Sequence, residues 1–250
     1  VNDAPPCTIS SFLSEKLETR DSTTNSEENL DRIFTELHPE WGIYEWVQHT
    51  AERQCVILAL RSALWLMTGN RENMIECQQD PQSRLTSHTW AELQRFVRLA
   101  DLNQYDLECV MVFLTIRGLG KSKAFLRRCS PTVRKEPELA VAASMVNLLY
   151  MMPSVRQLNK EQKTVVHNML HLSVHFKFAQ FIQGENIPKN IEMLQSEVQK
   201  RGHRTFMLYL FSSICVMSGV TGTVTLAGSL FLTENNAVML MLGIKSLVQV

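Results

Sequence analysis

The sequence has no excess of charge of either sign. Lys and Arg together number 25, as do Asp and Glu, so the formal net charge is zero. A chain without a net field has no overall attraction for nucleic acid or for an acidic membrane surface, so we expect no nucleic-acid partner. Hydrophobic residues make up 45% and charged residues 20%, which is the balance of a globular protein rather than of a disordered or coiled-coil chain.

Paired cysteines and glycosylation sequons are also missing. None of the six cysteines forms a C-x-x-C pair or lies near a His at zinc-finger spacing, which predicts buried or free thiols: Cys7, Cys55, Cys77, Cys109, Cys129 and Cys215. No Asn-x-Ser/Thr occurs, and residues 1–8 resemble neither a signal peptide nor a transit peptide. We predict an intracellular protein of the cytoplasm or an organelle interior, and the initial Val leaves open whether a leader was removed.

Strand-like alternation is confined to a short stretch near 223–226, whereas apolar residues recur at helical spacing through most of the chain. We therefore predict an all-α fold, a compact multi-helix bundle. The polar residues 1–29 predict a flexible N-terminal arm with one short helix near 12–20, and residues 30–250 predict a single helical domain. The expected helices cover 41–67, 87–100, 107–114, 138–152, 159–183 and 188–201.

Several helix ends carry local signals. Asn159 with Gln162 forms a capping-box pattern, and Ser87 is expected to cap the helix that follows it. Pro188 is placed to open a helix. The expected stops are Gly69, Pro153 and Gly202.

Residues 206–232 contain no charged side chain and follow a basic segment, so they are the membrane-span candidate of this chain. The second half of this run is rich in Ser, Thr and Gly, which is too polar for a typical span. We expect a buried helix followed by a Gly-rich loop, with a span through 206–228 as the alternative.

Residues 114–122 read Leu-Thr-Ile-Arg-Gly-Leu-Gly-Lys-Ser and contain the sharpest local pattern. Gly120, Lys121 and Ser122 fit the end of a phosphate-binding loop, in which backbone N–H groups surround a phosphate. However, Thr115 stands where that loop needs its first glycine, and no apolar strand ending in Asp follows.

The same segment resembles the metal-binding turn of the HD-domain phosphohydrolase superfamily. Residues 116–121 match its apolar-His-Asp-apolar-Gly-Lys signature, with Arg117 in place of the His and Gly118 in place of the Asp. Residues 176–188 and 218–222 are similar to segments of HD-like helical proteins, so the resemblance spans about 41–232. It implies a helical bundle with metal ions between helices.

The two replacements remove the ligand chemistry that this resemblance implies. A guanidinium stays protonated and glycine has no side chain, so neither binds a metal. We therefore expect no catalytic residue and no cofactor. Arg117, Lys121, Ser122 and Lys123 instead predict an anion site, and the alternative is a glycine cap followed by a solvated basic helix.

His167, His171 and His175 recur every four residues on one expected helix. Neighbouring members of such a stripe can chelate one ion, and Glu185 would be the third ligand if the chain folds back. The alternative is a half-buried structural stripe. Asn168 stands where a zinc-peptidase helix carries its catalytic Glu.

These patterns predict a non-catalytic interaction or structural subunit on an HD-hydrolase-like fold, a pseudoenzyme that forms part of a larger assembly with other protein subunits. The alternative is an active metal-dependent phosphohydrolase or nucleotide-binding enzyme. Its atypical ligand set would be His49, His167, His171 and Glu185.

Overall fold

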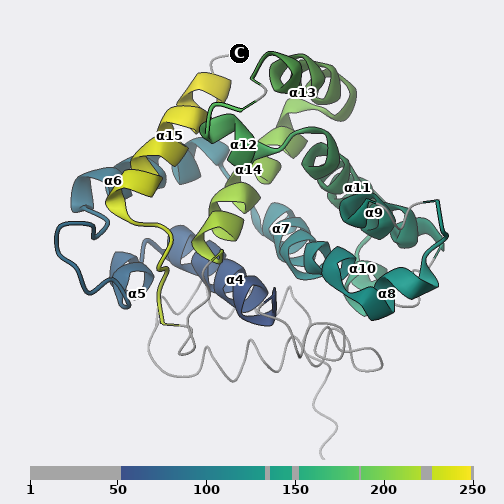
Figure 1. Cartoon of the computed structure of the whole chain (residues 1–250), viewed down its shortest axis with the longest axis horizontal. Coiled ribbons are helices and arrows are strands. Elements are labelled where there is room, and N and C mark those ends of the chain that lie inside the picture. Colours follow the sequence, from purple (N-terminus) through teal and green to yellow (C-terminus); the bar gives the residue numbers. More distant parts are fainter. Residues whose placement is uncertain (1–51, 133–135, 148–151, 186, 221–226, 249–250) are drawn as a thin grey trace, which may run out of the picture.

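Helices form every regular element in the part of the chain that the computed structural model describes, which is residues 52–132, 136–147, 152–185, 187–220 and 227–248 (Figure 1). The predicted all-α fold is therefore confirmed. The helices are α4 (Glu52–Thr68), α5 (Arg71–Ile75), α6 (Ser87–Ala100), α7 (Gln104–Arg117), the 3-10 helix η1 (Gly118–Lys121), α8 (Lys123–Arg128), α9 (Pro137–Asn147), α10 (Pro153–Gln157), α11 (Lys160–His175), α12 (Phe178–Ile182), α13 (Ile187–Arg201), α14 (His203–Ser218) and α15 (Glu234–Val248).

Helix α14 lies at the centre of the bundle. Every residue from Thr205 to Cys215 is buried, and α14 packs against α4, α7, α11 and α13 (Figure 1). A helix that is apolar on all faces must be surrounded by protein or by lipid, and here neighbouring helices surround it. The uncharged run that begins at Phe206 is thus a core helix, as expected.

The residue after α14 has no room for a side chain, because it lies against the backbone of α4. A Cβ atom at Gly219 would lie 2.3 Å from the carbonyl oxygen of Cys55. None of the described helices is long and apolar enough to cross a membrane. The alternative of a span through 206–228 stays a prediction. Residues 221–226 lie outside the described residues, as does the strand-like stretch near 223–226.

Two capping boxes fix helix starts. The side chain of Asn159 accepts a hydrogen bond from Gln162 N, and Asn159 N donates to Gln162 Oε1, which confirms the predicted start of α11. Asn103 and Asp106 form an equivalent box at α7. The predicted cap Ser87 is wrong by one residue, because Thr86 is in the extended conformation and accepts the bond from Thr89 N.

The helix predicted over 159–183 is in fact two helices. It ends at His175, because Phe176 takes an extended conformation and inserts its ring into the core. The chain then turns into α12. Pro153 begins α10 rather than only ending the helix before it, and Gly69 and Gly202 end α4 and α13 with positive φ, as predicted.

Some predictions concern residues that the structure does not describe. They are the polar arm over 1–29, the start of the domain at 30, the first part of the helix over 41–67, His49 and Cys7. The remaining cysteines are free thiols, as predicted. Burial raises the pKa of Cys109 to about 12 and also raises the pKa of Cys215, so both thiols are protonated and inert near neutral pH.

Candidate functional site

Residues 114–117 end α7, residues 118–121 form η1, and α8 begins at Lys123. The strand–loop–helix geometry of a phosphate-binding loop is therefore not formed. Ser122 is the N-cap of α8, and its buried hydroxyl accepts a hydrogen bond from Phe125 N. Lys121 Nζ forms an ion pair with Glu52 Oε1 at 2.6 Å. Lys123 is exposed at the start of α8. Of the predicted anion group of Arg117, Lys121, Ser122 and Lys123, Lys121 is thus ion-paired, Ser122 is a buried helix cap and Lys123 is exposed to solvent.

Arg117 and Gly118, which stand in place of the His and Asp of the HD signature, have different surroundings. Gly118 is buried, and a Cβ atom there would lie 3.2 Å from Val56 Cγ2 of α4. Arg117, one residue earlier, lines a cavity between α7, α11, α12 and α14. Arg117 is thus the member of the predicted group that reaches a pocket.

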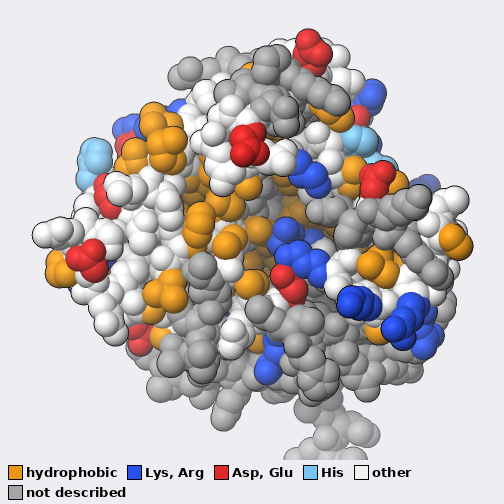
Figure 2. Space-filling view, viewed as in Figure 1, with side chains coloured by type: hydrophobic (Ala, Val, Ile, Leu, Met, Phe, Trp, Pro, Cys, Tyr) orange, Lys and Arg blue, Asp and Glu red, His pale blue; other side chains and the backbone are white. Residues whose placement is uncertain are grey.

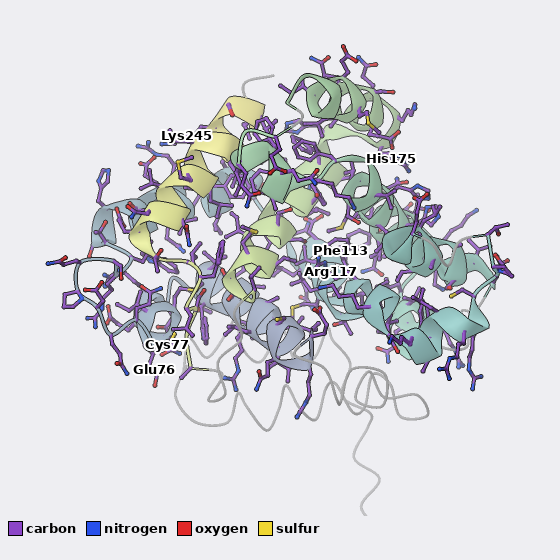
Figure 3. The ribbon with its side chains drawn as sticks, viewed as in Figure 1. Glu76, Cys77, Phe113, Arg117, His175 and Lys245 are labelled. Carbon is purple, nitrogen blue, oxygen red and sulfur yellow. The ribbon has the colours of Figure 1, made fainter. Side chains whose placement is uncertain are left out.

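This cavity, called the Arg117 pocket below, has a volume of about 150 Å³. Figure 3 shows Phe113 and Arg117 together on the side of α7 that faces α14. In Figure 2, Lys and Arg side chains gather near the middle of this face, beside hydrophobic ones. The lining residues are Phe113, Arg117, Ser173, Phe176, Lys177, Phe178, Ala179, Tyr209, Ser213, Val216 and Met217.

Helical spacing brings these side chains together. Phe113 and Arg117 are four residues apart on α7, and Tyr209 and Ser213 are four apart on α14, so each pair lies on one helix face. The turn between α11 and α12 supplies Lys177. The pocket therefore exists because α11 ends early, where the sequence predicted a continuous helix.

Hydrogen bonds hold this turn in place. Tyr209 Oη donates to the carbonyl oxygen of Phe176 at 2.8 Å, and Lys177 Nζ donates to the carbonyl oxygen of Ser173 at 3.0 Å. The rings of Phe176 and Tyr209 meet edge to face, with centroids 6.3 Å apart. The backbone that carries Arg117, on α7, and Lys177, at the start of α12, is therefore held by packed helices and not by a long loop.

A second concave surface lies between α6 and α15, and it is called the α6–α15 groove below. Its apolar residues are Phe96, Leu99, Met241, Ile244 and Val248, and its charged residues are Glu92, Arg95 and Lys245. Glu92 pairs with both Lys245 and Arg95, which links the two helices. In Figure 2, hydrophobic side chains are also exposed over α15.

A larger cavity, of about 320 Å³, separates α13 from α14 and α15. Apolar and amide side chains line it, together with His203, and no Arg, Lys, Asp or Glu is among its described lining residues. It therefore offers volume but few groups that would orient a polar ligand.

A model of the family described as "Family of unknown function (DUF6829)" matches residues 23–248. The chain belongs to the DUF6829 family. No curated protein and no solved structure matches it. The match includes both the Arg117 pocket and the α6–α15 groove. Membership of DUF6829 assigns no activity, and the relation to the HD superfamily stays a prediction.

The histidine stripe lies on α11 of this DUF6829 chain, against α13. The rings of His167 and His171 are 4.5 Å apart and those of His171 and His175 are 6.2 Å apart, all three half-buried. Among the described residues no three His, Cys, Asp or Glu side chains could hold one metal ion. The predicted set of His167, His171 and Glu185 is therefore not assembled among these residues.

Acid is expected to destabilise the fold through His171. Burial, and then the charges of His167, Arg201 and His175, lower its pKa from 6.5 to about 4, against a smaller opposing effect of Glu197. The unfolded state therefore binds the proton more readily, and stability falls as the pH drops from 6.5 towards 4.

Urea unfolding at about pH 7 and about pH 5 tests this expectation. The His171→Gln variant should lose less stability on acidification than the unsubstituted chain. The matched variant His88→Gln, at an exposed residue of α6, should behave like the unsubstituted chain. Equal losses in the unsubstituted chain and His171→Gln would contradict the assignment to His171.

Most residues of the Arg117 pocket carry no signal in the sequence that marks them as lining one site. Lys177 lies in the segment quoted for the HD resemblance, but nothing in that pattern marks it as a partner of Arg117. The i, i+4 spacing of Tyr209 and Ser213 was a usable signal, because it places two hydroxyl groups on one face of an otherwise uncharged run.

Proposed function

We propose that the chain is an interaction subunit that binds a partner protein at the α6–α15 groove. The observation that supports this is the exposure of large hydrophobic side chains on these two helices: Leu99 is 62% exposed, Leu242 56%, Met239 51% and Val238 39%. Hydrophobic side chains gathered on one surface are typical of protein interaction sites.

The shape and charge of the groove select the kind of partner. Val238, Leu242 and Lys245 follow i, i+4, i+7 spacing along the exposed side of α15, and Lys245 also lines the groove. Arg95 and Lys245 share one carboxylate, that of Glu92, so the rim has an excess of positive charge. The partner is therefore an amphipathic helix with an apolar stripe beside acidic residues.

Site-specific photo-crosslinking in cells tests the proposal. A photoreactive phenylalanine analogue at position 242 should form one heterologous adduct, and the cross-linked peptide should be an acidic amphipathic helix. The same analogue at Val146, which is 72% exposed on α9, is the matched control and should not form that adduct. A second variant, Arg95→Glu together with the probe at 242, should lower the adduct yield several-fold.

Three outcomes would overturn the proposal. One is equal labelling from positions 242 and 146. Another is an adduct with twice the mass of the chain, which would show self-association instead. The third is a cross-linked peptide that lacks acidic residues. The loss of catalysis in an HD-like ancestor stays a prediction beside this proposal, as does the alternative of an active phosphohydrolase.

A further inference from the structure

We propose that the Arg117 pocket binds a small carboxylic acid that carries a compact apolar group. This site differs from the α6–α15 groove, and its ligand is a small molecule rather than a protein. The proposal rests on the volume of the pocket, on its two cations and on its aromatic lining.

The volume and lining determine the size and polarity of the ligand. Cavities of about 150 Å³ lined by apolar side chains accept a molecule the size of benzene. The Arg117 pocket has this volume, and Phe113, Phe176 and Phe178 are among its lining residues. An apolar group of one ring, or a branched chain of similar size, therefore fits beside the aromatic side chains.

The charged lining residues determine the sign of the ligand. Arg117 and Lys177 are both cationic and both line the pocket, which favours an anionic group on the ligand. A guanidinium presents N–H donors in a planar fork that matches a carboxylate, and an ammonium adds a point charge.

Two features favour a carboxylate over a phosphate. The pocket is mostly apolar, and a singly charged carboxylate costs less free energy to remove from water than a doubly charged phosphate. The hydroxyl groups of the pocket are also partly used, because Tyr209 donates to Phe176 O and Ser213 donates to Tyr209 O. Lys177 itself donates to Ser173 O, so recognition rests on the charges of Lys177 and Arg117 and on the planar guanidinium fork, which matches one planar anionic group.

Titration calorimetry with phenylacetate as the probe tests the proposal. We expect saturable binding with one site per chain and a Kd on the order of 1 mM or tighter. Benzyl alcohol, which keeps the ring and lacks the charge, should bind at least about tenfold more weakly. Phenyl phosphate should also bind more weakly than phenylacetate.

Variants assign the binding to the pocket. Arg117→Met and Lys177→Met should each weaken phenylacetate binding about tenfold or more, because each keeps the aliphatic bulk and removes one charge. Lys123→Met is the matched control, since this exposed lysine does not line the pocket, and its Kd should be unchanged. Thermal melting of each variant identifies those that fold, and Lys177→Met serves if Arg117→Met does not.

Four results would overturn the proposal. No saturable binding of phenylacetate to the unsubstituted chain up to about 10 mM would contradict it. Equal affinity in the folded Arg117→Met or Lys177→Met variant would move the site elsewhere. Tighter binding of phenyl phosphate would replace the carboxylate with a phosphate ligand, and equal binding of benzyl alcohol would remove the role of the cations.

Discussion

The Gly219→Ala substitution is expected to destabilise the fold by about 3 kcal/mol or more. A Cβ atom at this position would lie 2.3 Å from Cys55 O and 3.2 Å from Ala59 N, both backbone atoms of α4. Backbone atoms cannot rotate away as a flexible side chain does, so α4 and α14 would have to separate. Because α14 packs against α4 at the centre of the core, that separation would disturb many buried contacts at once.

Urea unfolding of the purified variant measures this effect. Gly202→Ala is the matched control: Gly202 also adjoins α14, but a Cβ atom there has no neighbour within 4 Å. Its φ of +86° with ψ of +147° lies in a region that glycine almost alone adopts, so alanine there costs about 1–3 kcal/mol through backbone strain, and the control should lose less than Gly219→Ala. Equal losses in the two variants would show that the contact between Gly219 and α4 is not what limits the substitution.

The Asp106→Ala substitution is expected to cost about 3 kcal/mol. Asp106 is buried, accepts a hydrogen bond from Asn103 N in the capping box of α7, and forms an ion pair with Arg204 of α14. Arg204 also donates to the carbonyl oxygens of Ala100 and Asp101, where α6 ends. Removal of the carboxylate therefore leaves a guanidinium without its charge partner at the junction of three helices.

The same unfolding assay, at low and at high salt, separates this junction from an ordinary surface pair. Glu92→Ala removes the partner of Lys245, whose side chain is 51% exposed, and should cost below about 1 kcal/mol. Screening by salt should reduce the loss in Glu92→Ala more than the loss in Asp106→Ala, because Asp106 is the more buried carboxylate. A cost for Asp106→Ala no greater than that for Glu92→Ala would contradict a structural role for this junction.

Features that depend on a few neighbouring residues were predictable from the sequence. The capping box of Asn159 and Gln162 involves residues three apart, so its chemistry is visible in one turn of the chain. The stops at Gly69 and Gly202 depend on the φ of one residue. The error at Ser87 has the same local origin, because Thr86 carries an equally suitable hydroxyl one residue earlier.

Features that depend on distant residues were not predictable in this way. The sequence placed Lys121 beside Arg117 in an anion group, but Lys121 pairs with Glu52, which is 69 residues away. The end of α11 at His175 depends on Phe176 entering the core beside Tyr209, which is 33 residues further on. The residues around His175 would also allow α11 to continue, so no local pattern predicts that the helix ends there. Its end depends on the packing of α14 against the turn.

By itself, the sequence determined the helical class of this protein, the burial of α14 and several helix ends, since apolar periodicity and capping are properties of short segments. The tertiary structure alone decided which charged side chains pair, Arg204 with Asp106 at a helix junction and Glu92 with Lys245 across the α6–α15 groove, and that Arg117 and Lys177 line one cavity. The physical reason is that such pairings arise only when whole helices pack, and helix packing depends on the complementary shapes of faces far apart in the chain.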